Sequence, residues 1–193
     1  MTRDEHLIET CAASKSVFEG KILHVFVDDI NLPNGAKGFR EYIKHIGAVA
    51  VLPLTDDGNV ICVRQYRYAV EQVTTEIPAG KLDSPDEDPR EAALRELREE
   101  TGACCKSLTY LGTYLASPAI LDEKINLYLA RGLDFGETDP DDDEFIDVVH
   151  IPLQEMVERV MAGEILDGKT QLAVLKVGEL LRREKEEKET ETV

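Results

Sequence analysis

The sequence contains few positive charges, and none of its apolar runs is long. Its 193 residues include 22 Lys and Arg against 39 Asp and Glu, which gives a formal net charge of −17 at pH 7. A chain of this sign is not attracted to nucleic acid or to an anionic membrane surface unless it carries a local basic patch. No apolar run approaches the roughly 20 residues that span a bilayer. We therefore expect neither a nucleic-acid partner nor a membrane partner.

Cysteine is also scarce, with four residues at positions 11, 62, 104 and 105. The adjacent Cys104 and Cys105 do not readily form a disulfide of normal geometry with each other, and no cysteine spacing matches a zinc site. The first 17 residues carry acidic side chains and lack an unbroken apolar stretch, so they do not indicate a secretion signal. These features predict reduced thiols in a cytoplasmic protein.

The hydrophobic share of 42% suffices for the core of one domain. Alternating patterns and turn residues predict strands at 16–32, 48–54, 60–66, 108–115, 125–130 and 144–151. Turns at residues 33–35 and 57–58 predict a hairpin at the front of the chain and a second hairpin between the next two strands. Helices are predicted at 153–162 and 170–183, followed by a charged, solvated tail.

The clearest predicted element is a helix that begins at Pro89 and ends before Gly102. Asp88 suits the N-cap, Pro89 the first helical position, Glu91 the third and Gly102 the position just past the end. Many strands with this central helix and a C-terminal helix predict a mixed sheet covered by helices, in an α/β or α+β layering. Neither periodicity nor composition decides the topology.

Three carboxylates, those of Glu96, Glu99 and Glu100, occupy neighbouring positions on one face of this helix. They lie in its last two turns, where acidic side chains oppose the helix dipole at about 0.3 to 1 kcal/mol each. Two carboxylates about 5 Å apart repel by roughly 3 kcal/mol at an effective dielectric near 20. A wet helix face tolerates this repulsion, and a divalent cation among the oxygens removes it. The triplet alone therefore leaves two interpretations, a solvated face or a magnesium site.

The order of the surrounding residues favours the metal site. The run IPAG at residues 77–80 is followed by a polar loop, by Glu87, by seven residues and then by RELREETG from Arg95 to Gly102. This order resembles the signature of the Nudix hydrolases: Gly, five residues, Glu, seven residues, Arg-Glu, an aliphatic residue, any residue, Glu-Glu, any residue and Gly. The match from Glu87 to Gly102 is complete, and such a string is very improbable by chance.

The sequence departs from the signature at one point. Six residues, instead of five, separate Gly80 from Glu87. Asp86 would restore the count of five but would change the distance to Arg95, so Glu87 is our choice and Asp86 the alternative. Because the extra residue falls in a Ser-Pro-Asp loop, we expect a bulge that leaves the helix in place.

The resemblance implies a metal site and a reaction. Its ligands to Mg²⁺ or Mn²⁺ would be the backbone carbonyl of Ala79 and the side chains of Glu96, Glu99 and Glu100, with Glu99 sharing or bridging the metals. Glu87 and Arg95 would pair and hold the loop and the helix in register. The implied reaction is attack of water on a diphosphate that joins a nucleoside to another group, with metals neutralising the phosphoryl charge. Bound metals would also let an acidic protein attract an anionic substrate.

The resemblance covers residues 16–153 and is nearest to the ADP-ribose pyrophosphatase group, in which a proline similar to Pro118 follows the motif by about sixteen residues. In that group an arginine similar to Arg67 contacts the diphosphate and one similar to Arg40 reaches the substrate from the N-terminal region. A residue similar to Glu76 helps to read the adenine side. Taken alone, the arginines indicate surface residues and Pro118 a strand terminator, but guanidinium groups suit bidentate phosphate binding.

A carboxylate that positions or deprotonates water is expected in the loop of residues 137–144. The family supplies such a glutamate just before a strand similar to EFIDV, and Glu144 matches it. A run of aspartates in a loop is by itself a sign of solvation. Asp141, Asp142 and Asp143 are alternatives to Glu144, as the base or as ligands to further metal.

The resemblance implies an α/β fold, a Nudix α/β/α sandwich with a mixed sheet, preceded by an N-terminal β-hairpin region. Residues 1–46 would form this β-region and serve dimerisation, residues 47–183 the Nudix domain and residues 184–193 a charged tail. The expected reaction is magnesium-dependent hydrolysis of ADP-ribose, or a close ADP-sugar, to AMP and ribose 5-phosphate. The family also implies a homodimer in which Arg40 helps to build the partner's site.

Three alternatives stay open at this point. One is a Nudix pyrophosphatase for another nucleoside diphosphate derivative, such as GDP-mannose or NADH. The second is a noncatalytic Nudix-like domain that senses a nucleotide sugar, and the third is an acidic module that binds magnesium without hydrolysis. The crowded glutamates at 96, 99 and 100 count against a pure binder, which has no need of them.

Overall fold

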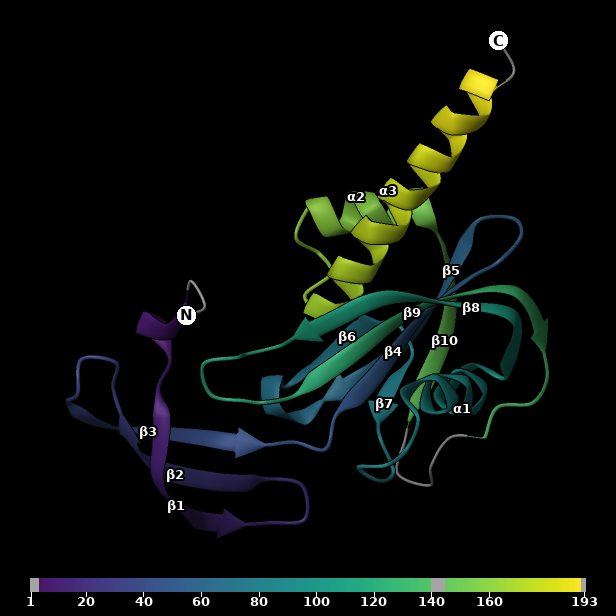
Figure 1. Cartoon of the computed structure of the whole chain (residues 1–193). Helices are drawn as coiled ribbons and strands as arrows, with labels where there is room; N and C mark the ends of the chain where they lie inside the picture. The colour runs from purple at the N-terminus through teal and green to yellow at the C-terminus, as the bar shows by residue number, and fades with distance from the viewer. Residues whose placement is uncertain (1–3, 140–144, 192–193) are drawn as a thin grey trace. The chain divides into compact units, whose positions relative to one another are not determined.

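The structure, a computed structural model, describes residues 4–139 and 145–191. The chain divides into two units, Met1–Ile46 with Leu115–Lys124 and Gly47–Tyr114 with Ile125–Val193. Each unit is built around its own sheet (Figure 1). The elements in chain order are η1 (Glu5–Leu7), β1 (Thr10–Glu19), β2 (His24–Asn31), β3 (Lys37–Lys44), β4 (Ala48–Leu54), β5 (Asn59–Arg67), η2 (Tyr68–Val70), β6 (Gln72–Glu76), β7 (Ala79–Lys81), α1 (Pro89–Thr101), β8 (Ala103–Leu115), β9 (Lys124–Phe135), β10 (Ile146–Pro152), α2 (Leu153–Met161) and α3 (Gly168–Glu191).

The first unit contains a three-stranded antiparallel sheet in the order β1, β2, β3. The predicted front hairpin is confirmed, because Leu32 donates a backbone hydrogen bond to Ala36 at 2.9 Å across the turn between β2 and β3. The predicted strand 16–32 is divided in two, since residues 20–23 turn and Gly20 donates to the Leu23 carbonyl at 2.8 Å. All ten residues of β1 are exposed, so no alternation of buried side chains marks its beginning.

The second unit contains a seven-stranded mixed sheet. Its main order is β10, β5, β4, β9, β8, and β6 and β7 pair with β5 and β4. Strand β4 is antiparallel to β5 and β7 and parallel to β9. The predicted hairpin between residues 48 and 66 is therefore confirmed as β4 and β5.

Strand β4 lies at the centre of two cores, and all seven of its residues are buried. Val49 and Val51 face one core with Leu97 of α1. Leu52 faces the other core with Met156 of α2 and with α3. Because successive side chains of a strand point to opposite faces, β4 packs against helices on both sides of the sheet (Figure 1). The predicted α/β/α sandwich is confirmed.

Helix α1 has the predicted bounds, and its ends show why. The Asp88 side chain accepts a hydrogen bond from the Arg90 backbone N–H at 2.8 Å, as an N-cap does. Gly102 ends the helix with φ of 69° and donates to the Arg98 carbonyl at 2.8 Å. A left-handed residue at this position suits glycine. A capping side chain therefore fixes where the motif helix begins, and a left-handed glycine fixes where it ends.

The remaining elements follow the predictions with shifted bounds. Strands β8 and β9 are longer than predicted, and α3 begins at Gly168 and continues as a helix to Glu191. The short strands β6 and β7 were not predicted. Within the described residues, no helix is both long and apolar enough to cross a membrane.

Candidate active site

Arg95 lies at the centre of the carboxylates of the motif. Its Nη1 donates hydrogen bonds to Glu96 at 2.7 Å and to Glu99 at 3.1 Å. Its Nε donates to Glu87 at 3.3 Å, and its Nη2 donates to the Lys81 carbonyl at 3.2 Å. Burial alone would lower the pKa of Arg95, but its hydrogen bonds with Glu87, Glu96 and Glu99 outweigh burial and raise that pKa. One guanidinium group therefore offsets the repulsion among three carboxylates.

Glu96 and Glu100 face β7, and both are largely buried, with 8% and 2% of their surface exposed. The Ala79 backbone N–H donates a hydrogen bond to Glu100 Oε2 at 3.1 Å. At Gly80, an added Cβ atom would lie 2.0 Å from Glu96 Oε1, so any larger residue would push this carboxylate out of its place beside the strand backbone. The glycine of the motif is explained by this close approach.

The loop before α1 brings Glu87, and not Asp86, to Arg95. Glu87 accepts a hydrogen bond from the Asp83 backbone N–H at 2.6 Å, and its own N–H donates to the Ser84 carbonyl at 3.2 Å. The pKa of Glu87 is lowered by the Asp83 hydrogen bond and by Arg95. Asp86 is exposed in this turn, which accommodates the extra residue between the glycine and Glu87.

The carboxylates are not gathered as a metal cage in this arrangement. Across residues 4–139 and 145–191, no three His, Cys, Asp or Glu side chains converge closely enough to hold a metal ion. Arg95 instead supplies the positive charge at Glu96 and Glu99. The donor set nevertheless fits Mg²⁺ by its chemistry, because Glu96, Glu99 and Glu100 offer hard oxygen ligands from one face of α1.

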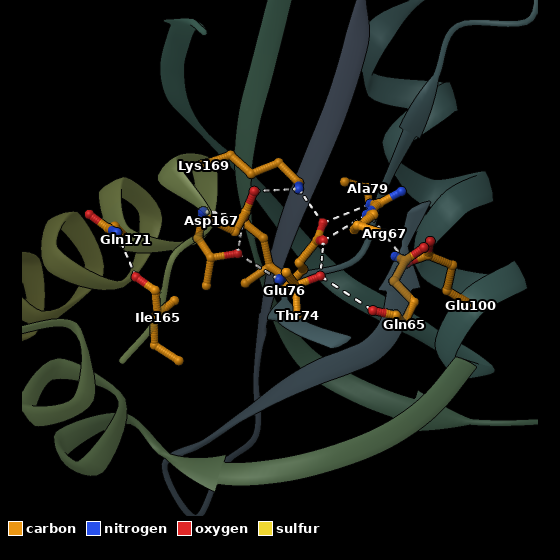
Figure 2. A network of polar contacts seen from close by, with 12 residues as sticks. Gln65, Arg67, Thr74, Glu76, Ala79, Glu100, Ile165, Asp167, Lys169 and Gln171 are labelled. Atoms are coloured by element: carbon orange, nitrogen blue, oxygen red, sulfur yellow. Dashed lines mark hydrogen bonds and ion pairs between the residues drawn. The ribbon is translucent and has the colours of Figure 1, made fainter. Parts of the chain in front are cut away.

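A second group of charges surrounds Glu76, which ends β6 (Figure 2). Arg67 donates to both Glu76 carboxylate oxygens, from Nε and from Nη2, at 2.7 Å each. Lys169 Nζ lies 2.5 Å from Glu76 Oε2, and the Thr74 hydroxyl donates to Oε1 at 2.7 Å. Burial would raise the pKa of Glu76, but Arg67, Lys169 and Thr74 together lower it to about 2. Glu76 is therefore a fully ionised carboxylate inside the protein.

This group is connected to the motif helix. The Glu76 hydrogen bonds raise the pKa of Arg67, and the negative charge of Glu100 contributes to the same shift. Along the chain, Glu76 is followed by Ile77, Pro78 and then Ala79, whose N–H contacts Glu100. Two residues predicted for the substrate and the predicted metal ligands thus lie in one region of the second unit.

Lys169 and Asp167 complete this group, although no sequence pattern had indicated either residue. Asp167 Oδ2 accepts hydrogen bonds from the backbone N–H and the hydroxyl of Thr170, at 3.0 and 2.5 Å, and Oδ1 lies 2.9 Å from Lys169 Nζ. The Thr170 hydroxyl in turn accepts the Ile77 N–H at 2.9 Å. The run DGKT at residues 167–170 does carry an N-cap signal. No local pattern, however, indicates that its lysine pairs with Glu76, which lies 93 residues earlier in the chain.

The start of the acidic loop lies against the end of α1. The Gly136 N–H donates to the Gly102 carbonyl at 2.7 Å, and the Asp139 N–H donates to the Glu99 carbonyl at 3.0 Å. Residues 136–139 are therefore held beside the last turn of the motif helix. Glu144 itself, like Asp141, Asp142 and Asp143, lies outside the described residues.

Arg40 and Pro118 belong to the first unit. Arg40 lies on β3, donates to the Phe39 carbonyl at 2.9 Å and forms an ion pair with Glu9. Pro118 is exposed in a turn where the Ile120 N–H donates to the Ser117 carbonyl at 3.0 Å. The remaining described residues of the predicted site lie in the second unit.

Comparisons with known proteins agree with this arrangement. The model of the NUDIX domain matches residues 44–169. An ADP-ribose pyrophosphatase of Bacillus subtilis (strain 168) is 41% identical over 183 residues, which cover 93% of this chain and 98% of that protein. A protein named methanol dehydrogenase activator, from Bacillus methanolicus, is 42% identical over 168 residues, covering 86% and 90%. A crystal structure of an ADP compounds hydrolase superposes with a TM-score of 0.80 at 25% identity, covering 91% of this chain and 95% of that one.

The fold and the site define a class: an α/β/α sandwich in which a short helix presents three crowded glutamates beside a glycine-containing strand. The family match covers most of this sandwich. The chain belongs to the Nudix family.

Proposed function

We propose that this protein hydrolyses the diphosphate bond of ADP-ribose, or of a close ADP-sugar, and releases AMP and ribose 5-phosphate. The observation that carries the proposal is the 41% identity to an ADP-ribose pyrophosphatase over almost the full length of both chains. The motif from Glu87 to Gly102 is complete as well. Strand β7 lies directly beside the glutamates of α1, since the Ala79 N–H contacts Glu100 and the Gly80 backbone closely approaches Glu96.

Mg²⁺, with Mn²⁺ as an alternative, is part of the proposal. Glu96, Glu99 and Glu100 would hold it together with the backbone carbonyl of Ala79. When bound, the metal would neutralise charge on the phosphoryl oxygens and help to activate water. The fit of hard oxygen donors on one helix face supports this assignment.

The protein's own groups have separate roles in the proposal. Arg67 binds the diphosphate, for which a planar guanidinium group is suited, and Glu76 lies on the adenine side. Glu144 positions or deprotonates the attacking water, with Asp141, Asp142 and Asp143 as alternatives. Arg95 and Glu87 hold the carboxylates in place. Arg40 and Pro118 are assigned to the substrate by resemblance to the family.

A homodimer and a cytoplasmic location complete the proposal. Dimerisation is supported by the large apolar side chains that the first unit exposes: Leu7, Ile8, Val17, Phe18, Ile22, Leu23 and Phe39. A reducing compartment is supported by the four cysteines, all of which are free thiols.

Product analysis tests the reaction. The protein is incubated with Mg²⁺ and, separately, with ADP-ribose, GDP-mannose, NADH or a diadenosine polyphosphate. We expect AMP and ribose 5-phosphate to form fastest from ADP-ribose, and a chelator to abolish the reaction. Cleavage of another compound alone would reject ADP-ribose and keep a Nudix hydrolase. Binding of ADP-ribose without cleavage of any compound would favour the noncatalytic sensor.

A further inference from the structure

Glu76 shares its single negative charge between two cations. Only 3% of its side-chain surface is exposed, and a buried carboxylate requires both a compensating charge and hydrogen bonds. Arg67 uses both carboxylate oxygens, whereas Lys169 uses Oε2 alone. With Asp167, which also contacts Lys169, these side chains form a neutral group of two carboxylates and two cations.

The pair with Glu76 fixes the orientation of Arg67. The Nε and Nη2 atoms face the carboxylate, so the planar guanidinium group turns its Nη1 edge away from Glu76. The Arg67 side chain is 43% exposed, in contrast to its partner. A partly exposed guanidinium group held by a buried carboxylate is prepared to bind an anion, because its orientation is set before the ligand arrives.

Lys169 is itself held rigidly at the start of α3 (Figure 2). Asp167 caps this helix through the Thr170 N–H and also contacts Lys169 Nζ at 2.9 Å. The Thr170 hydroxyl accepts the buried Ile77 N–H, which fixes the first turn of α3 against the residue that follows Glu76. The ammonium group is therefore positioned by contacts on both sides, and it is 11% exposed.

We propose that Lys169 is a positioning residue for substrate binding: by sharing the Glu76 carboxylate, it keeps the Nη1 edge of Arg67 turned toward the substrate diphosphate. The inference rests on the proposed function and on the assignment of Arg67 to the diphosphate. Without Lys169, Arg67 would be the single cation of this group facing two carboxylates, Glu76 and Asp167. Their combined attraction would draw the guanidinium group away from an incoming phosphate.

The test compares Lys169→Met with the wild-type protein. We expect KM for ADP-ribose to rise about tenfold while kcat changes by less than about twofold, because the lost interaction acts on binding and not on the chemical step. The dissociation constant for ADP-ribose, measured by calorimetry in the presence of a chelator, rises in parallel. Lys169→Arg, which keeps the charge, restores most of the affinity. Lys185→Met, an exposed lysine of the same helix, leaves KM unchanged.

A double-mutant cycle separates positioning from direct contact. In an Arg67→Ala background, Lys169→Met has no further effect on KM if Lys169 acts through Arg67. An equal rise of KM in that background would mean that Lys169 contacts the substrate itself, and would overturn the proposal. An unchanged KM in folded Lys169→Met would overturn it as well.

Three outcomes separate a failure of folding, a failure of the proposed function and a failure of the role of Lys169. Should Lys169→Met fail to fold by circular dichroism, Lys169→Gln, which retains a hydrogen-bond donor, gives the same comparison. A wild-type protein that does not cleave ADP-ribose would overturn the proposed function and this inference with it. Cleavage by the wild type together with an unchanged KM in the variant would overturn the role of Lys169 alone.

Discussion

Glu100 combines the deepest burial of the three motif carboxylates with a hydrogen bond from the β7 backbone. Glu100→Gln retains an amide oxygen that can accept the Ala79 N–H but removes the charge. We expect hydrolysis of ADP-ribose with Mg²⁺ to fall by about 100-fold or more, equivalent to about 3 kcal/mol in activation free energy. The free energy of unfolding should change by less than about 1 kcal/mol, since the packing is preserved.

The matched control for this prediction is Glu91→Gln, an exposed glutamate in the first turn of the same helix. Rates of AMP formation and urea unfolding are measured for both variants. Unchanged turnover of Glu100→Gln would remove this residue from the mechanism, and a loss of the fold would reassign it to stability.

Glu76 makes stability depend on pH. Its pKa is about 2, below its ordinary value of 4.5, so its ionised form stabilises the folded state fully above about pH 4.5. That contribution is lost as the pH falls toward 2. The difference in pKa corresponds to about 3 kcal/mol at neutral pH. Glu76→Gln should therefore be less stable than the wild type at pH 7. The difference between their free energies of unfolding should shrink as the pH falls from 5 to 2.

Urea unfolding at pH 7, 4 and 3 measures that gap. Glu164→Gln, at an exposed position, should show a small difference from the wild type that does not depend on pH in this way. A gap for Glu76→Gln that stays constant from pH 7 to 3 would contradict the ion-pair explanation.

At the scale of single residues, the sequence predicted a contact between neighbours in the chain, Glu87 and Arg95, but not one between distant residues, Glu76 and Lys169. The contact between Glu87 and Arg95 follows from a fixed spacing around one helix start. The contact between Glu76 and Lys169 joins residues 93 positions apart, and no local pattern specifies it. A buried acid requires a cation, but which cation supplies the charge depends on how α3 packs beside β6.

The end of α1 is the element on which the start of the acidic loop depends. Gly102 has φ of 69°, and an added Cβ would lie 2.4 Å from the Gly136 carbonyl oxygen. Gly102→Ala should lower the free energy of unfolding by about 1–2 kcal/mol through backbone strain and by a further 1–3 kcal/mol, roughly, through the clash. Displacement of residues 136–139 should also lower kcat.

Gly58→Ala provides the control, because Gly58 has φ of 85° in the β4–β5 turn with nothing within 4 Å of an added Cβ. It tests backbone strain without a clash. Urea unfolding and kcat are compared for both variants. Equal losses of stability, with kcat unchanged in Gly102→Ala, would show that the contact with Gly136 does not matter.

Whole elements were predicted where several local signals agreed. Helix α1 has a capping aspartate, a proline at the first position and a terminal glycine, and its bounds are as predicted. Strands β6 and β7 have five and three residues, too few for a periodicity to be recognised. Strand β4 is buried on both faces, so its apolar run predicted a strand but not its parallel pairing with β9.

The whole molecule carries a net charge of −17 although its proposed substrate is an anion. The cations near the site, Arg67, Arg95 and Lys169, are each paired with carboxylates. In the proposed reaction, attraction of the diphosphate would therefore depend on bound metal and on the partly exposed Arg67 side chain. The net charge follows from composition, but the pairing of these three cations with carboxylates does not.

The sequence also did not predict that Leu115–Lys124 belongs to the same unit as the N-terminal strands. That association joins segments far apart in the chain, so no local pattern indicates it.

The proposed homodimer can be tested through Arg40, which lies on β3 of the first unit. If Arg40 serves the partner's site, two inactive variants should complement each other. Arg40→Ala keeps an intact Glu100, and Glu100→Gln keeps an intact Arg40. In the mixed dimer, one of the two sites then has both residues. Random reassembly of equal amounts makes half of the dimers mixed, so about a quarter of the wild-type activity should return.

The two variants are mixed after mild dissociation and reassociation, and AMP formation from ADP-ribose is measured with Mg²⁺. Each variant mixed with itself is the control and should stay inactive, and sedimentation velocity confirms that dimers have re-formed. If Arg40 acts within its own chain, both sites of the mixed dimer lack one residue and no activity returns. A monomeric wild-type protein would reject the homodimer, and with it the role of Arg40 across an interface.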